Sequence, residues 1–460
     1  MKNRLKWKKT LAAVLSIFCM LQTNPMKALA ADYWPEAPET LSPSVIVMEA
    51  STGTVLYEKN SEETHYPASI TKILTTLIAL ENSDLNEVVT FSDESIDETE
   101  GSGIARDYGE QMTMEQCLYA VMLESANECA YAVAEHVAGS MEAFVDMMNE
   151  KVKELGCTNT HFANPHGLHD ENHYTTCKDM ALIAQAAYKN ETFRIITGTK
   201  IYTIPPTNKH EEETILRNHQ EMLVPYRSTK YVYENCVGGK TGYTDAARST
   251  LVTFAEKDGM NLICVVMNTE SPNQWTDTTN LFDYCFDNFQ ALNISENETD
   301  YTANAGKKSG TLNTNDSFVE LDETAVLVIP KTAEFADAKS VISYNNEVSN
   351  IAGTISYTYA GRDVGSADIK TTGVMIQGYV FDNQKTENTA EEEVVATIKI
   401  KPMQIVLIVI AVIVLLILVI CGKWSYDNFY IIRHNMMVRK HRREQFQTKR
   451  NKVRRRRYRR

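Results

Sequence analysis

The sequence predicts an α/β domain of the α+β type, in which an antiparallel sheet is built from both ends of the domain. Residues 44–58 indicate two strands joined by a turn at 51–53. Residues 110–190 carry apolar side chains at three- and four-residue spacing, which is typical of helices. Strand-like segments return after residue 236, with a hairpin turn at 257–259. Strands at both ends with helices between them favour one mixed domain.

The elements between these landmarks follow from local patterns. A helix is expected to begin near Ser69, because Pro67 and Ala68 suit a helix start and an apolar run follows. Residues 164–174 (NPHGLHDENHY) are rich in turn formers and indicate a loop. An amphipathic segment, TTNLFDYCFDNFQAL, then closes the domain near residue 292. The predicted domain therefore spans 31–292.

A second, smaller domain is expected after a linker. Residues 293–314 are polar and rich in Asn and Thr, as in a linker. Residues 315–382 alternate apolar and polar side chains and indicate a small all-β domain. An acidic stretch at 383–402 forms a stalk that leads to a long apolar segment.

Both ends of the chain carry segments typical of export and membrane attachment. Residues 1–30 have a basic start, a short apolar run and a final Ala-Leu-Ala, which favours a cleaved signal peptide over an uncleaved anchor. Residues 403–422 carry no charge and match the length of a bilayer, which favours a transmembrane helix over a core helix. Residues 423–460 contain 15 Lys and Arg against two acidic residues. The positive-inside rule therefore places this tail in the cytoplasm and residues 31–402 outside the cell.

The charge distribution narrows the set of partners. The full chain has a net charge of −14, but residues 31–422 contain 25 basic and 58 acidic residues and carry −33. So acidic a surface binds nucleic acid poorly, and we expect no nucleic-acid partner. The basic tail suits lipid headgroups beside the membrane better than nucleic acid.

The cysteines do not form a recognisable framework. An odd number lie between the two apolar segments, with irregular spacing and no Cys-x-x-Cys, which argues against a disulfide framework or a zinc site. We expect most of them to be buried as small apolar residues, with one disulfide as an open alternative. They are Cys117, Cys129, Cys157, Cys177, Cys236, Cys264 and Cys285.

Ser69 and Lys72 are the first candidates for chemistry. At this spacing both side chains lie on one face of a helix, so the hydroxyl and the amine can touch. A serine beside a neutral amine is a nucleophile with its own base, and a helix start favours negative charge on the oxygen. No other serine in the sequence has a lysine three residues later. The simpler alternative is a surface lysine one turn from a serine.

Ser125 and Asn127 form a second, weaker motif. The functional interpretation is that Ser125 relays a proton between Lys72 and a leaving amine, while Asn127 binds Lys72 or a substrate amide. The alternative is a serine that interrupts a helix. Only Ser125 combines a helical context with a position between Lys72 and the third motif. The same Ser-x-Asn pattern begins at three other serines: Ser271, Ser295 and Ser343.

Lys240, Thr241 and Gly242 form the third motif, at the start of a strand-like segment. A cation beside a hydroxyl suits a free carboxylate, and glycines let a ligand backbone lie against a strand edge. The similar tripeptide at 308–310 lies in the polar linker, with no strand beside it. A second lysine close to Lys72 would also lower the pKa of its amine by like-charge repulsion.

These three motifs, in this order and at this spacing, resemble the penicillin-recognising serine peptidases and β-lactamases. The resemblance is closer to the low-molecular-mass penicillin-binding proteins, the serine-type D-Ala-D-Ala carboxypeptidases. Segments such as YPASITKILTTLIALE, MLESANECAYAVAEHV and GGKTGYTDAARSTLVTFAEK carry it. It covers about 40–290 and implies a β-lactamase/transpeptidase-like domain with an antiparallel sheet flanked by helices. Residues 315–382 resemble the C-terminal β-sandwich of the family.

The resemblance implies roles for the first two motifs. Ser69 would be the acylated nucleophile, Lys72 its general base and Ser125 a proton relay. Asn127 would contact substrate. His166 lies in a loop similar to one in the family, where we expect it to be structural.

The resemblance also implies a binding strand. Lys240, Thr241 and Gly242 would line the site of the terminal carboxylate. The backbone N–H groups of Ser69 and Tyr243 would form the oxyanion hole. Arg217 matches an arginine that the family places near the substrate carboxylate.

The implied activity is removal of the terminal D-Ala from peptidoglycan stem peptides through an acyl-serine, without metal or cofactor. β-Lactams would be covalent inhibitors. One rival is a β-lactamase, although no Glu-x-x-x-Asn lies between Ser125 and Lys240. The other is a penicillin sensor or wall-binding protein that stays acylated. The sequence departs from the family at Arg248, where glycine is usual, and in its membrane-spanning anchor.

Overall fold

The computed structural model of the protein describes residues 33–298, 319–345 and 350–371. The predicted signal peptide, acidic stalk, transmembrane segment and basic tail lie outside these residues, as does most of the predicted linker. Within the described ranges, no helix combines the length and apolar character that crossing a bilayer requires. The chain divides into two compact units, Met1–Phe381 and Asp382–Arg460, and every described residue belongs to the first.

A five-stranded antiparallel sheet is the framework of the larger domain, with strand order β2-β1-β9-β8-β7. Strand β1 pairs with β9 in a register that sets Ser44 opposite Met267, so the predicted sheet built from both ends is confirmed. The turns at 51–53 and 257–259 lie where they were expected. The strands are β1 (Ser44–Glu49), β2 (Val55–Lys59), β7 (Cys236–Thr244), β8 (Arg248–Lys257) and β9 (Met260–Thr269).

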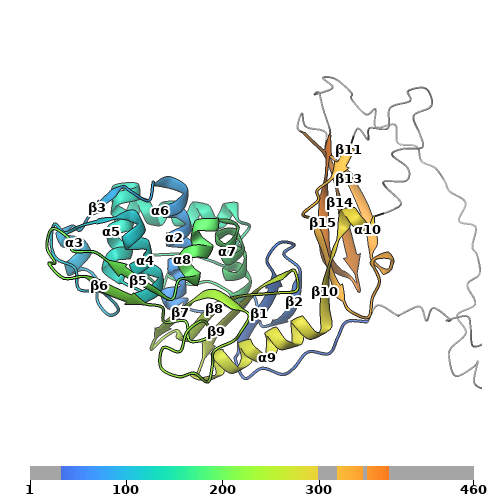
Figure 1. Cartoon of the computed structure of the whole chain (residues 1–460), viewed down its shortest axis with the longest axis horizontal. Helices are drawn as coiled ribbons and strands as arrows, with labels where there is room; N and C mark the ends of the chain where they lie inside the picture. Colours follow the sequence, from blue (N-terminus) through green and yellow to red (C-terminus); the bar gives the residue numbers. More distant parts are fainter. Residues whose placement is uncertain (1–32, 299–318, 346–349, 372–460) are drawn as a thin grey trace, which may run out of the picture. The chain divides into compact units, whose positions relative to one another are not determined.

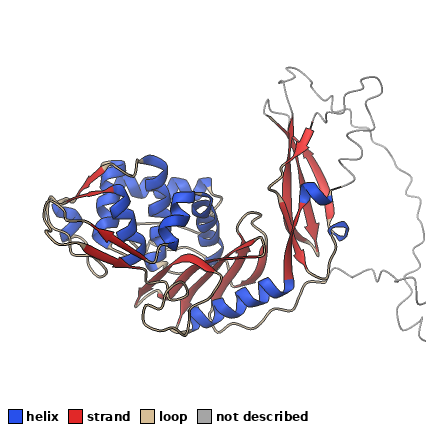
Figure 2. Cartoon of the chain, viewed as in Figure 1, coloured by secondary structure: helices blue, strands red, loops and turns tan. Residues whose placement is uncertain are grey.

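Helices cover both faces of this sheet (Figures 1 and 2). Helix α9 (Asn273–Asn288) packs against β8 and β9 on one face. The opposite face carries the helices that lie between β2 and β7 in sequence. They are α2 (Lys72–Asn82), α3 (Asp93–Asp97), α4 (Met114–Tyr119), α5 (Asn127–Ala138), α6 (Met141–Glu154), α7 (Cys177–Lys189) and α8 (Glu191–Gly198).

Side-chain alternation along β8 separates the two cores. Val252 and Phe254 pack among the helices of the α2 face, whereas Leu251 and Ala255 pack against α9. Because both faces are covered, β8 is buried from Ser249 to Ala255, although three of these seven residues are polar. Helix α2 is buried along most of its length, at the centre of the helical layer.

Helix ends follow local capping chemistry. A capping box at Thr113 and Gln116 begins α4, and the side chains of Ser140 and Thr176 accept backbone N–H groups at the starts of α6 and α7. Gly139, in the left-handed conformation, ends α5.

Four short strands were not predicted. β3 (Val88–Thr90) pairs with β4 (Gln111–Thr113), and β5 (Ile201–Ile204) pairs with β6 (Thr214–Arg217). Three or four residues are too few for a recognisable two-residue period.

The amphipathic segment that was expected to run to residue 292 is helical only as far as Asn288. Phe289–Asn293 form β10, which pairs with β12 (Val326–Pro330). The backbone partner in β12 therefore overrides the helical pattern at the end of this segment.

The described part of the predicted all-β region 315–382 consists mainly of strands. A second sheet has the order β11-β15-β14-β13, and side chains from β12, β14 and β15 share one apolar core. Its strands are β11 (Val319–Leu321), β13 (Lys339–Tyr344), β14 (Ile351–Tyr359) and β15 (Arg362–Thr371). The short helix Phe335–Asp337 is the described exception, and another short helix, Ile294–Asn297 (α10), lies in the predicted linker.

The seven cysteines between the two apolar segments all lie in the described residues and are free thiols there, so the alternative of one disulfide is not found. Six are buried and Cys157 is half-buried, as expected of small apolar residues.

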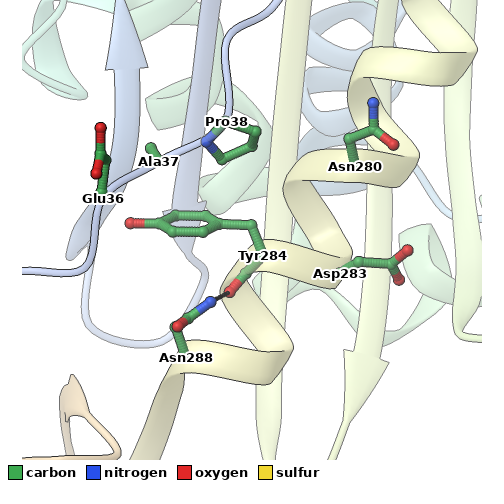
Figure 3. Close-up of a pocket in the computed structure, with 7 residues that line it drawn as sticks. All are labelled: Glu36, Ala37, Pro38, Asn280, Asp283, Tyr284 and Asn288. Carbon is green, nitrogen blue, oxygen red and sulfur yellow. Dashed lines mark hydrogen bonds between the residues drawn. The ribbon is translucent and has the colours of Figure 1, made fainter.

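The N-terminal segment lies along α9, where the Tyr284 hydroxyl donates to the carbonyl of Pro35 at 2.8 Å. Figure 3 shows the pocket that this packing leaves. It lies on the α9 face of the sheet, whereas Ser69 lies on the other face. It is therefore separate from the candidate active site. Its lining residues are Glu36, Ala37, Pro38, Asn280, Asp283, Tyr284 and Asn288.

Candidate active site

Ser69 lies on a tight turn rather than on the first turn of an α-helix. Ala68–Thr71 form a 3-10 helix, and α2 begins at Lys72. Ala68 has a left-handed backbone (φ +51°), and its carbonyl accepts a hydrogen bond from the Thr71 hydroxyl at 2.8 Å. Gly167 lies against this turn so closely that a Cβ there would be 2.0 Å from the Ala68 oxygen. Only glycine allows this approach.

Lys72 is fully buried and its amine reaches the serine. Its Nζ lies 3.2 Å from Ser69 Oγ, which confirms the predicted contact. Nζ also donates to Asn127 Oδ1 at 2.6 Å and to the carbonyl of His166 at 2.5 Å. A neutral amine has two N–H groups and one lone pair. With the two shorter contacts taking the N–H groups, the lone pair is left for the Ser69 hydroxyl.

The surroundings favour this neutral amine. Burial is the main cause that holds the pKa of Lys72 well below its ordinary value, and the nearby Lys240 lowers the pKa further. The predicted like-charge effect is therefore present but second to desolvation. Glu128 acts in the opposite direction, and burial raises the pKa of its own carboxyl group.

Ser125 lies at a break between two helical segments. A π-helical turn, Ala120–Glu124, precedes it and α5 follows it. Ser125 has a left-handed backbone (φ +62°). Its Oγ is buried and, among the described residues, has no hydrogen-bond partner. A buried hydroxyl without a partner, two residues before the Asn127 that binds Lys72, can form a hydrogen bond with a ligand.

Asn127 is held from both ends of its side-chain amide. Its Oδ1 accepts the Lys72 bond, and its Nδ2 donates to the carbonyl of Glu100 at 2.5 Å. Of the two predicted contacts of Asn127, the structure contains the one to Lys72.

Strand β7 brings the third motif to Ser69. An ideal Cβ on Gly242 would lie 2.8 Å from the Ser69 backbone nitrogen, so only glycine fits there without a shift. The hydroxyl of Thr250, on the neighbouring β8, donates to the Pro67 carbonyl at 2.8 Å and fixes the turn to the sheet. Tyr243 follows Gly242 and is 60% exposed, with its hydroxyl donating to Asp245.

The side chain of Lys240, a residue of β7, is buried, and its Nζ donates to the carbonyl of Thr241 at 2.9 Å. Burial lowers its pKa to about 7, against the opposing effect of Glu124. A bound carboxylate would favour the charged form and raise this pKa.

Arg217 and His166 occupy the margins of the site. The backbone N–H of Arg217 donates to Glu124 at 2.7 Å, which places this residue beside the Ser125 turn, and its side chain is exposed. The His166 ring is buried, with a pKa well below its ordinary value because of burial. Its Nδ1 accepts from the N–H of Leu168. The ring is therefore structural, as expected.

Two contributions to the site were not predicted. The His166 carbonyl, a backbone group, binds Lys72, and the buried carboxyl of Glu128 influences it electrostatically. No side-chain pattern signals a backbone acceptor. Among the described residues, no group of three or more His, Cys, Asp or Glu side chains is placed to hold a metal ion.

The fold and the site together define a class. The site contains three features of a serine acyl-transfer enzyme. Ser69 contacts the desolvated Lys72, the Ser125 hydroxyl has no partner among the described residues, and Lys240 lies on the strand beside Ser69. The sheet and its helical layer are those expected for the β-lactamase/transpeptidase-like fold.

Comparison with known proteins agrees with this class. The family model for D-alanyl-D-alanine carboxypeptidase (Peptidase_S11) matches residues 32–271. The D-alanyl-D-alanine carboxypeptidase DacF of Bacillus subtilis (strain 168) is 31% identical over 381 residues, which cover 80% of this chain and 92% of the relative. The chain belongs to the D-alanyl-D-alanine carboxypeptidase family and is a serine peptidase.

Solved structures show the same fold. Penicillin-binding protein 5 from Haemophilus influenzae has a TM-score of 0.58 at 25% identity, covering 74% of this chain and 98% of its own. The D-alanyl-D-alanine carboxypeptidase of Mycobacterium tuberculosis H37Rv has a TM-score of 0.51 at 30% identity, covering 55% of this chain and 94% of its own. The likeness to penicillin-binding protein 5 extends beyond the residues of the larger domain.

Proposed function

We propose that this chain is a membrane-anchored carboxypeptidase that removes the terminal D-Ala from peptidoglycan pentapeptides. The contact of 3.2 Å between Ser69 Oγ and the buried Lys72 amine carries the proposal. The substrate class comes from the family and its relatives, which are D-alanyl-D-alanine carboxypeptidases.

Acylation begins with Ser69 Oγ attacking the carbonyl carbon of the penultimate D-Ala, while Lys72 Nζ takes the hydroxyl proton. The N–H groups of Ser69 and Tyr243 stabilise the resulting oxyanion. The C–N bond then breaks. The proton passes from Lys72 through Ser125 to the leaving amine of the terminal D-Ala. The support for Ser125 is its buried hydroxyl, which has no partner among the described residues.

Lys240 and Thr241 bind the terminal carboxylate before the reaction and release it with the free D-Ala. A buried cation is a strong partner for a carboxylate, because the charge-assisted bond forms away from competing water. Gly242 keeps the β7 edge open beside Ser69. Arg217 adds positive charge at the margin of this site.

Deacylation completes the cycle. A water molecule attacks the ester carbonyl of the acyl-serine while Lys72 removes its proton, and Ser69 Oγ departs and regains a proton. β-Lactams enter the same first step as mimics of the acyl-D-Ala-D-Ala end. A slow second step would leave the protein acylated.

The topology proposal rests on sequence. Residues 1–30 direct export, residues 403–422 anchor the chain in the membrane, and residues 423–460 lie in the cytoplasm against lipid headgroups. Residues 315–382 form a β-sandwich that separates the catalytic domain from the membrane. The catalytic domain then acts on the wall side of the membrane.

The test uses the full-length chain in detergent with a pentapeptide that ends in D-Ala-D-Ala. Wild-type protein should release D-Ala and gain the mass of one penicillin on Ser69. Ser69→Ala should lose both, whereas Ser343→Ala, at an exposed serine of the β13 strand, should keep both. Release of D-Ala by Ser69→Ala would show that another group is the nucleophile. Rapid penicillin turnover would indicate a β-lactamase, and a stable adduct without D-Ala release would indicate a sensor.

A further inference from the structure

Arg248 has a backbone conformation that glycine would adopt more easily. It begins β8, opposite Thr244 of β7, and its φ is +56°. A side chain in the left-handed region destabilises the fold relative to glycine unless it makes a useful contact. A strained residue beside a functional strand suggests a role for its side chain.

The contact that Arg248 makes within the chain is weak. Its Nε lies 3.6 Å from Glu270 Oε1, and the two side chains are 51% and 75% exposed. Charge-assisted bonds between such groups are normally below about 3 Å, and exposed pairs contribute little to stability. The ion pair alone therefore does not account for an arginine at this position. Because this ion pair is weak, the Arg248 guanidinium can leave Glu270 and bind another carboxylate.

The order of the site along β7 shows which part of a substrate would pass Arg248. Lys240 and Thr241 are the proposed carboxylate-binding residues, and Gly242, next along the strand, lies beside Ser69. If the proposed function is correct, the residues before the scissile bond therefore continue past Tyr243 toward the β7–β8 turn, where Arg248 lies.

The distance from such a peptide to Arg248 can be bridged. Neighbouring strands are about 4.8 Å apart, so a peptide on the free edge of β7 would lie about 10 Å from β8. Two long side chains reaching toward each other span that gap. Asp245, in the same turn, has a negative charge that opposes binding of a substrate carboxylate. Its Oδ1 already accepts a hydrogen bond from the Tyr243 hydroxyl at 3.1 Å.

We propose that Arg248 is a specificity-determining residue that binds a carboxylate of the substrate, one or two residues before the terminal D-Ala-D-Ala. Glu270 is its partner when no substrate is present. The inference rests on the proposed function, because it assumes that the peptide lies along β7. The role is selection, and Arg248 takes no part in the proton transfers at Ser69.

The experiment compares matched peptides with the full-length chain. One pair is acetyl-Glu-D-Ala-D-Ala and acetyl-Gln-D-Ala-D-Ala. The second pair, acetyl-Glu-Ala-D-Ala-D-Ala and its Gln analogue, moves the carboxylate one residue away. In at least one pair, wild-type protein should hydrolyse the Glu peptide with a kcat/KM about three- to tenfold higher than the Gln peptide. High salt should reduce this preference.

Two variants change the preference in opposite directions. Arg248→Gly should remove it by lowering kcat/KM for the Glu peptide to the value for the Gln peptide. Glu270→Gln should increase it, because the guanidinium no longer has an internal competitor. A purely structural ion pair would instead make both variants alter the Glu and Gln peptides equally.

The outcomes separate this inference from the proposed function. Equal kcat/KM values for Glu and Gln peptides in wild-type protein, with D-Ala released from both, overturn the role of Arg248 and keep the carboxypeptidase. A preference that survives in Arg248→Gly also overturns it. No D-Ala release from any peptide overturns both.

Discussion

Lys72 and Lys240 are buried inside the candidate active site, whereas Arg248 at its rim keeps half of its side chain in water. Burial lowers the pKa of both lysines, to about 7 for Lys240 and well below the ordinary value for Lys72. Arg248 remains charged because a guanidinium does not deprotonate in proteins. The two buried lysines therefore lose their protons more easily than an exposed lysine does, whereas Arg248 can only attract or repel charge. In the proposals above, the buried lysines act on the reacting end of the substrate, and the half-exposed Arg248 selects among substrates.

Removing the interior base should have the largest effect. Lys72→Met fills the same space without an amine, so acylation should fall by about a thousandfold, within the range for loss of a general base. The rate of penicillin-adduct formation, followed by mass spectrometry, measures this step directly.

Lys178→Ala serves as the control for that variant, because this lysine forms an ion pair with Glu62 at the surface. It should acylate at the wild-type rate. A Lys72→Met protein that is folded by circular dichroism and still acylates rapidly would contradict the assignment of the base.

The dependence of kcat/KM on pH should separate the two lysines. It should have a rising and a descending limb, each changing kcat/KM by about tenfold per pH unit. Lys72 acts unprotonated, so kcat/KM rises with pH through its pKa. Lys240 binds the carboxylate when protonated, so kcat/KM falls as pH rises through about 7. Lys240→Arg keeps its charge at higher pH and should move only the descending limb upward.

That outcome can be checked with one substrate and one buffer series. The rising limb, which belongs to Lys72, is the internal control and should stay in place. A descending limb that does not move in Lys240→Arg would show that another group titrates there.

The smallest effect is expected at the rim, on stability. Arg248→Gly relieves the left-handed backbone and should stabilise the fold by about 1 kcal/mol, less the small contribution of the ion pair. The urea midpoint at constant m measures this change. Glu270→Ala removes the ion pair without altering the backbone at residue 248. A loss of stability of the same size in both variants would show that the ion pair outweighs the strain.

Much of this architecture could be predicted because it follows from side-chain periodicity. The buried strands β8 and β9 join at Asp258-Gly259, a turn sequence that signals a hairpin. The Ser69–Lys72 contact follows from their spacing on any helical turn, 3-10 or α. These features depend on residues close in sequence.

The unpredicted features depend on partners far along the chain. The left-handed backbone at Ala68 is supported by Gly167, and the His166 carbonyl reaches Lys72 from the same loop. Strand β10 forms because β12 pairs with it, against a local helical pattern. Backbone acceptors and close approaches of this kind leave no periodic trace in one sequence.

The pairing of β1 with β9 also affects when the candidate site can form during synthesis and folding of the chain. Ser44 lies opposite Met267, and Gly242 reaches the Ser69 nitrogen only when β7 has joined the sheet. A chain made from its N-terminus contains β1, Ser69 and Lys72 long before it contains β7 and β9. Such distant pairings fold slowly, because the loop between them must close first. A partly synthesised chain therefore contains Ser69 and Lys72 without β7 beside them. The burial that lowers the pKa of Lys72 is complete only after these strands have paired.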